Sequence, residues 1–168
     1  MKPIETVKNN AECEGILTDS YTGMLVMCQN DNPYAVPINH TYFDGKLYFH
    51  CAPTGLKLDM IRDNPNVCYV VSEFFGNSNK YTKGSKCHGE WESVIVYGKA
   101  RVVSDPTELC MAFSIFMKHY GSENYTPSEK SLKTTNAIII EVKSMTARRE
   151  IPEGEKRRTD YWSWSPMA

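Results

Sequence analysis

The stretch that most constrains the fold runs from Lys46 to Asn64, with the sequence KLYFHCAPTGLKLDMIRDN. Its first part, Lys46–His50, is rich in residues that favour β-strands. The segment Pro53–Gly55 then breaks the extended run, and apolar residues recur at helical spacing from Leu56 to Ile61. The pattern predicts a strand, a tight turn and the start of a helix.

Lys57 lies in the first turn of that predicted helix. A cation there faces the positive end of the helix dipole, which is unfavourable unless an anion is bound between them. Free backbone N–H groups, a glycine that permits close approach and a lysine together predict a phosphate-binding site. The alternative interpretation is a solvated lysine. His50 and Cys51 end the preceding strand beside this turn.

Short apolar segments bounded by turn residues dominate the rest of the chain. Pro37 indicates an edge strand or a bulge, and Asp44-Gly45 is a strong hairpin signal. A helix is predicted from Pro106 to the stop at Gly121, and a polar loop over residues 76–89. Strands are predicted at 15–18, 24–28, 34–43, 46–50, 67–71, 91–103 and 137–142, and further helical segments at 56–64 and 126–135. The order predicts a mainly β (α+β) fold, an antiparallel β-barrel with a few covering helices.

The 168 residues predict a single domain, residues 1–168, in which 147–168 form a C-terminal tail. A net charge of −1 gives no reason to expect nucleic acid or an acidic membrane as partner. No apolar run approaches the roughly 20 residues of a membrane helix. Six scattered cysteines without a C-x-x-C pair, after a start that lacks a signal-peptide pattern, indicate reduced thiols in the cytoplasm.

Patterns for metal binding and nucleophilic catalysis are weak. The pairs His50-Cys51 and Cys87-His88 are adjacent in sequence, and neighbours on a strand point to opposite faces. We therefore predict no metal site. The sequence also lacks a G-x-S-x-G motif, a dinucleotide-binding fingerprint and a Walker loop. The predicted phosphate-binding site remains the main chemical signal.

Four stretches in order resemble one family. They are Tyr34–His40, Gly45–Ala52, Gly55–Leu58 followed by Asn64–Val67, and Glu92–Ala100. Their order and spacing, from about residue 13 to 146, resemble the FMN-binding split-barrel superfamily of pyridoxamine 5'-phosphate oxidase-like proteins. Within that superfamily, the nitroimidazole-resistance branch is the most similar.

The resemblance implies a homodimeric split barrel that binds a flavin, FMN or alternatively FAD, in each of two interface clefts. Lys57 would hold the phosphate, with contacts from Thr54 and Gly55. Other implied flavin contacts are Pro37, Ile38, Asn39, His50, Cys51 and Ser93. His50 occupies the position of a characteristic histidine of the branch, which makes it the candidate catalytic residue. A structural barrel histidine is the alternative.

The sequence also departs from the family. Glu92 stands where many relatives have an arginine before the serine, which removes a positive charge from that segment. The C-terminal segment Tyr161–Pro166 differs from the ending of the true pyridoxamine phosphate oxidases, so we do not expect that activity.

The expected function is a flavin-dependent two-electron reductase of a small acceptor such as a nitroaromatic compound, with the flavin carrying the redox chemistry. One alternative is a non-catalytic flavin-binding or storage protein. Another is a haem-handling split barrel with His50 or His88 on the iron. The predicted strand Trp91–Val103 is apolar on both faces, which independently favours a dimer.

Overall fold

The computed structural model describes residues 4–7, 9–77 and 89–150. Within them, eight strands form one sheet in the order β3-β2-β6-β7-β8-β5-β4, and β1 pairs with β8. All these pairs are antiparallel. The strands are β1 (Glu5–Val7), β2 (Thr22–Gln29), β3 (Asn32–Asn39), β4 (Thr41–Phe43), β5 (Lys46–Cys51), β6 (Asn66–Asn77), β7 (Gly89–Val103) and β8 (Asn136–Glu150). The helices are α1 (Asn10–Asp19), α2 (Leu56–Asp63), α3 (Pro106–His119) and α4 (Glu129–Thr134). The predicted split β-barrel with a few covering helices is confirmed.

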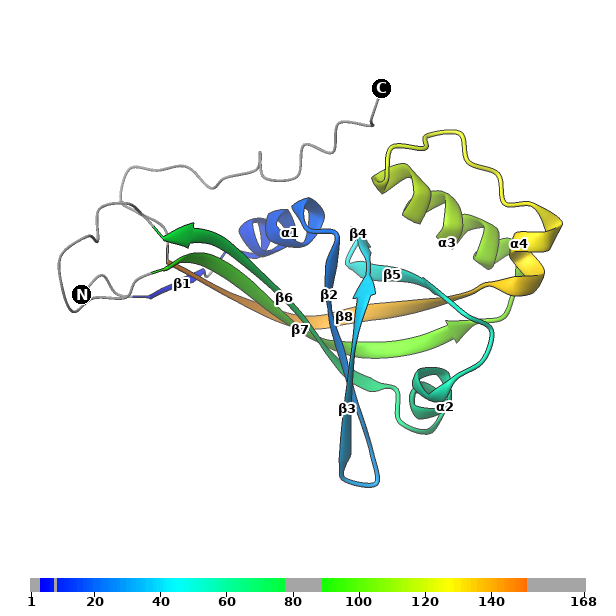
Figure 1. The fold of residues 1–168 in the computed structure, drawn as a ribbon, viewed down its shortest axis with the longest axis horizontal. Coiled ribbons are helices and arrows are strands. Elements are labelled where there is room, and N and C mark those ends of the chain that lie inside the picture. Colours follow the sequence, from blue (N-terminus) through cyan, green and yellow to red (C-terminus); the bar gives the residue numbers. More distant parts are fainter. Residues whose placement is uncertain (1–3, 8, 78–88, 151–168) are drawn as a thin grey trace.

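The sheet curls so that its two terminal strands are joined by one residue, His40. β3 and β4 end the strand order on opposite sides, yet they are consecutive in the chain (Figure 1). The prediction of one strand over 34–43 is therefore wrong, because the strand is interrupted at His40. There the imidazole is fully buried, and the backbone N–H donates to Tyr21 O at 3.1 Å.

The inner face of the sheet forms the main core. Residues paired across strands share a face, so Leu25, Tyr69 and Val96 form one buried row from β2 to β7. Gly23 is required beside this row, because an added Cβ would lie 2.7 Å from the Tyr69 ring and 2.5 Å from Val70 O. The inner face thereby fills with large side chains.

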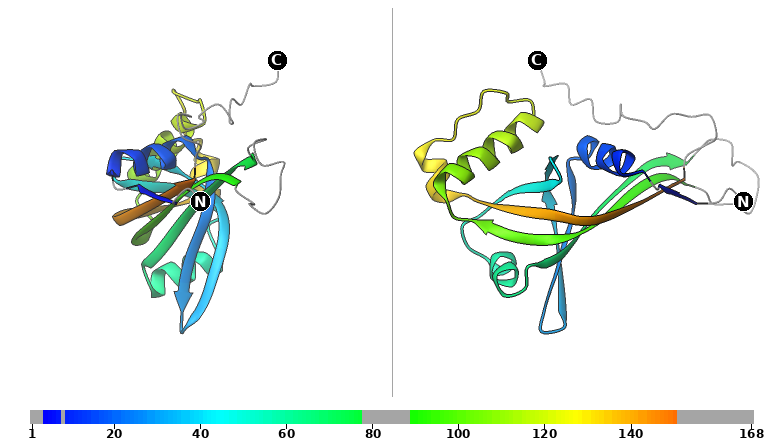
Figure 2. Two further views of the ribbon diagram at one scale, coloured as in Figure 1. Left: turned by 90° about the vertical axis from the view of Figure 1, so that its left-hand side faces the viewer. Right: turned by 180° about the vertical axis from the view of Figure 1, so that it is seen from behind.

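The outer face is divided into two parts. α3 packs over Tyr48, Val103 and Ile139, which we call the covered face. The β2–β6–β7 part of the same side carries Met24, Val70, Ile95 and Tyr97, which we call the open face. Met24 is 42% exposed and Tyr97 is 53% exposed. Figure 1 shows α3 and α4 together above one end of the sheet, and Figure 2 shows the β2–β3 hairpin projecting from the other elements.

The N-terminal region corrects one prediction. A strand was predicted at residues 15–18, but these residues belong to α1, whose first turn is capped by the Asn9 side chain. Cys13, Ile16 and Leu17 are buried, at the i, i+3, i+4 spacing of a helix face. Burial of this face overrides the local preference of Ile16, Leu17 and Thr18 for a strand.

The strands β6, β7 and β8 are longer than predicted. β6 continues to Asn77 and β7 begins at Gly89, so the ends of the predicted 76–89 loop belong to the sheet. The central part of that loop lies outside the described residues. β8 continues to Glu150, which places 147–150 of the expected tail in the sheet. The remainder of the tail also lies outside the described residues.

Candidate functional site

The turn between β5 and α2 begins the helix at a glycine of positive φ without a side-chain cap. Gly55 is the N-cap of α2 and has φ 135°, a conformation that strains residues with a side chain. It provides no side-chain hydrogen bond to the helix start. By contrast, the side chains of Asn9, Asp105 and Ser128 cap α1, α3 and α4. The first N–H groups of α2 thus lack the side-chain partner that the other three helices have.

Lys57 and Cys51 lie close together at this turn. Burial raises the pKa of the Cys51 thiol, and the nearby Lys57 charge opposes that rise. Lys57 is half-buried, while Thr54 and Gly55 are exposed. The next residue, Leu58, is fully buried and anchors the helix. We call Cys51, Thr54, Gly55 and Lys57 the turn set, because the structure brings these four predicted residues together.

His50 points to the other side of β5. Side chains alternate along the strand, so Phe49 and Cys51 face the main core and His50 faces α3. Its ring meets the Phe116 ring edge to face, with centroids 4.6 Å apart. Partial burial against α3 lowers the pKa of His50 below its ordinary value.

A cavity of about 150 Å³ opens beside His50. Its wall consists mainly of aromatic and apolar side chains, with two hydroxyl groups at α4 and its end. The lining residues are His50, Phe113, Phe116, Met117, Tyr125, Ser131 and Thr135. The lining contains no Asp, Glu, Lys or Arg, and the cavity is the size of a single small ring.

The predicted residues of the outer sheet lie elsewhere. Pro37 of β3 begins a row of paired residues that crosses the sheet through Met24 and Val70 to Ile95 of β7. Ser93 lies two residues before Ile95 on the same face of β7. We call Pro37, Asn39 and Ser93 the face set.

Two further residues from these segments point inward. Ile38 packs against the main core, and its carbonyl accepts a hydrogen bond from Tyr69 at 3.0 Å. Glu92 is buried on the inner face, opposite to Ser93. The departure from the family pattern at position 92 therefore lies on the other side of the strand from the face set.

Ser93 of the face set lies far from the turn set within one chain. His50 pairs with Ala137 of β8, and Ala137 pairs with Val103 of β7. His50 and Val103 therefore lie in one row across the sheet. Ser93 precedes Val103 by ten residues, which corresponds to about 30 Å along the strand. One flavin mononucleotide cannot contact both ends of such a strand.

A buried polar cluster at His40 was not predicted. His40 Nε2 lies 2.9 Å from Leu17 O and must donate to it, so Nδ1 is an acceptor 2.8 Å from the Tyr69 hydroxyl, whose single proton is shared between Nδ1 and Ile38 O. Burial lowers the pKa of His40 to about 4. Neighbouring rings of Tyr21, His119 and Tyr120 continue the cluster toward α3. The available signal was the run of aromatic residues on the buried side of α3.

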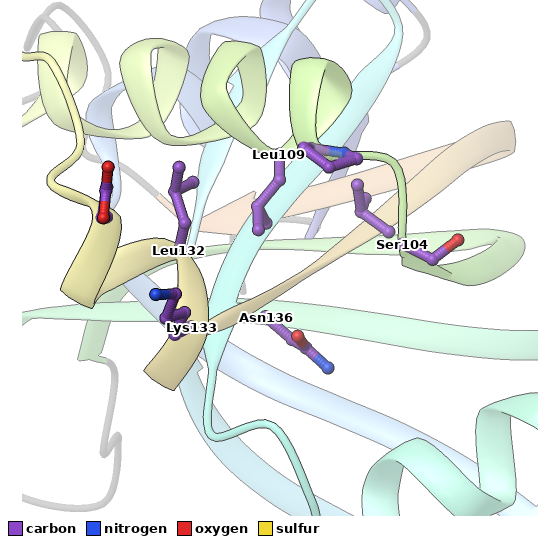
Figure 3. A pocket seen from close by; sticks show the side chains of 8 residues that line it. Ser104, Leu109, Leu132, Lys133 and Asn136 are labelled. Carbon is purple, nitrogen blue, oxygen red and sulfur yellow. The ribbon is translucent and has the colours of Figure 1, made fainter.

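A larger cavity, of about 310 Å³, lies between the start of α3, α4 and the ends of β7 and β8 (Figure 3). Its lining residues are Val103, Ser104, Pro106, Leu109, Glu129, Leu132, Lys133 and Asn136. None of the catalytic or flavin-binding residues predicted from the sequence lines this cavity.

Metal ligands do not cluster in the part of the chain that the structure describes: no three His, Cys, Asp or Glu side chains are grouped to hold an ion. The five cysteines in the same part of the chain are free thiols. No described helix is both long and apolar enough to cross a bilayer. His88 lies outside the described residues.

Comparison with known proteins gives consistent matches. A family profile described as pyridoxamine 5'-phosphate oxidase matches residues 9–149. An uncharacterized protein of Rhizobium meliloti (strain 1021) is 32% identical over 93 residues, 55% of this chain and 54% of that protein. The match thus spans about half the length of that curated relative.

Two solved structures share the fold. A candidate 5-nitroimidazole antibiotic resistance protein from Bacteroides thetaiotaomicron VPI-5482 is 26% identical, with a TM-score of 0.74, covering 88% of this chain and 89% of that one. An FAD- and haem-binding protein from Mycobacterium smegmatis is 12% identical, with a TM-score of 0.72, covering 90% of this chain and 76% of that one.

Proposed function

The chain belongs to the pyridoxamine 5'-phosphate oxidase family, and from this premise we propose that it is a homodimeric flavin-binding oxidoreductase. Its activity would be the two-electron reduction of a small acceptor such as a nitroaromatic compound. A bound flavin supplies the electron transfer itself. The chain's own residues bind the flavin, hold the acceptor and position a proton donor.

The observation that carries the proposal is the start of α2. The helix begins at a glycine with positive φ, without a side-chain cap, and its first turn contains the half-buried Lys57. Backbone N–H groups without a side-chain cap and an ammonium group in the same helical turn fit a phosphate monoester. This fit supports a flavin with its phosphate at the turn set.

The separation of Ser93 from the turn set supports the dimer. If both the turn set and Ser93 contact flavin, the turn set of one chain must meet Ser93 of another. The open face offers the surface for such contact, because Met24 and Tyr97 leave apolar area in water. A two-fold axis would pair this face with its own copy and generate two equivalent sites.

The cavity beside His50 supports a small acceptor. Phe113 and Phe116 provide apolar walls, and no Asp, Glu, Lys or Arg side chain lines the cavity. The neutral His50 imidazole can hydrogen-bond the acceptor through one N–H donor and one acceptor nitrogen, and its imidazolium form can transfer a proton to the reduced acceptor and return to neutral imidazole.

A flavin-binding protein without turnover is the second candidate. The contact between the rings of His50 and Phe116 favours it, because it gives His50 a packing role. A haem at His50 is less compatible with one chain, since about 150 Å³ is below the range of pockets that enclose large ligands.

The absorption spectrum of the purified protein and the Lys57→Met variant test flavin binding. We expect one flavin per chain in the wild type. Loss of a charge-assisted hydrogen bond should weaken FMN binding roughly tenfold to a hundredfold. Riboflavin, which lacks the phosphate, should bind both proteins equally. Equal losses for riboflavin and FMN would remove Lys57 as the phosphate ligand.

His50→Gln separates the reductase from the non-catalytic binder. The variant keeps a hydrogen-bond donor of similar size but cannot titrate. For the reductase, flavin content is retained and reoxidation by a nitroaromatic acceptor slows roughly 10²-fold. Equal reoxidation rates in both proteins between pH 6 and 8 would assign His50 a structural role.

A further inference from the structure

The larger cavity shares a wall with the turn set. Asn136 lines the cavity, and its Nδ2 donates to Pro53 O at 3.4 Å. The same residue pairs with Cys51 across β5 and β8. Pro53 directly precedes Thr54 and Gly55, so the proposed phosphate position and the cavity lie on two sides of one short segment.

The lining of this cavity is partly apolar and partly polar or charged. Leu109 from α3 and Leu132 from α4 provide apolar side walls, together with Val103. Figure 3 shows Asn136 beside the loop that leads from β5 to α2. Lys133 adds a cation to the lining and Glu129 a carboxylate. Such a site accepts a flat ring with apolar faces and polar edges, next to an anionic group.

We propose that this cavity binds the adenosine half of FAD, so that FAD is the preferred flavin. The inference rests on the proposed function, because the flavin phosphate must first lie at the turn set. The second phosphate would extend from the turn set past Asn136 toward Lys133. Adenine would lie between Leu109 and Leu132, with its amino group donating to an oxygen of Glu129 or Asn136. A volume of about 310 Å³ falls at the lower end of the range for ligand pockets.

Leu132→Trp tests the proposal by filling the cavity with an indole ring. Binding of FAD and of FMN is measured separately, by quenching of flavin fluorescence, on protein freed of its flavin. We expect the FAD dissociation constant of the wild type to be lower than that for FMN. In the variant, FAD binding should weaken at least about tenfold, because the adenine loses its apolar contacts, while FMN binding is unchanged.

Met111→Trp is the matched control. Met111 is half-exposed on α3, so the same tryptophan there should change neither dissociation constant. Lys133→Ala is a second variant that leaves the core intact, and it should weaken FAD binding by up to about fivefold with FMN unchanged. It keeps the proposal testable if Leu132→Trp fails to fold in thermal melting.

The possible results separate the two proposals. Loss of FAD binding alone, in Leu132→Trp or Lys133→Ala, supports the adenosine site. Unchanged ratios of FAD to FMN affinity in both variants, or a wild type that binds FMN as tightly as FAD, overturn it and leave the proposed function standing. A wild type that binds neither flavin overturns the proposed function as well.

Discussion

The covered and open faces of the sheet differ in what protects them from water. Both lie on the same side of the curved sheet and both carry apolar side chains. Under α3, Tyr48 and Ile139 are almost fully buried, whereas Tyr97 of the open face is 53% exposed. The comparison shows that this chain covers one part of its outer surface with a helix and leaves apolar side chains of the other part exposed, which is the surface we propose for the partner chain.

The largest effect is expected in the covered face. Phe113→Ala removes a buried ring from the contact between α3 and the sheet and leaves a cavity. The free energy of unfolding should fall by about 3–5 kcal/mol, measured by urea titration. Met111→Ala, on the exposed side of the same helix, should change it by less than about 0.5 kcal/mol. Equal effects would show that α3 does not cover the sheet as described.

The next effect concerns assembly. Tyr97→Glu places a charge on the open face, and a two-fold interface would bury two such charges. The dimer dissociation constant should rise at least about 1000-fold, measured by light scattering, with the circular dichroism spectrum retained. Met111→Glu, at a side chain of similar exposure, should leave the dimer intact. A wild type that is monomeric at micromolar concentration would contradict the role of the open face.

The smallest effect concerns His40, which joins the edge strand β3 to β4 beneath α3. Its pKa is about 4 in the fold and 6.5 in the unfolded chain, so the unfolded chain binds the extra proton between these values. Stability is therefore lost as pH falls from 6.5 to about 4, by up to about 3 kcal/mol. Urea titrations at pH 7, 5 and 4 should show a shallower loss in His40→Gln. If the free energy of unfolding depends on pH in the same way in both proteins, protonation of His40 does not contribute to the loss of stability.

Local sequence signals correctly predicted the elements in which turn residues and hydrophobic periodicity indicate the same structure. The strand–turn–helix of Lys46–Asn64 and the hairpin at Asp44-Gly45 form as expected, because turn chemistry and periodicity agree there. Residues 15–18 form helix instead of strand, since contacts of Ile16 and Leu17 with the distant sheet decide their conformation. The lengths of β6 and β8 were underestimated for the same reason, since pairing along β7 extends both strands past their apolar segments.

The candidate site could be predicted only in part. Lys57 was predicted as a phosphate ligand because a cation at a helix start is a local anomaly, and that role stays a prediction. The placement of His50 against Phe116 depends on residues 66 positions apart in the chain, which no local pattern reports. The same holds for the His40–Tyr69 hydrogen bond and for the cavity at Leu132. The distance between the turn set and Ser93 also became visible only with the strand register.

The central claim is that each flavin lies between the turn set of one chain and the face set of its partner. Lys57→Met and Ser93→Trp, each confirmed as a dimer, should bind little flavin alone. When differently tagged chains are mixed and allowed to exchange, half of the dimers are mixed, and each has one intact site. Flavin content should then recover to about a quarter of the wild-type value. Mixed dimers that copurify through both tags but recover no flavin would contradict the claim.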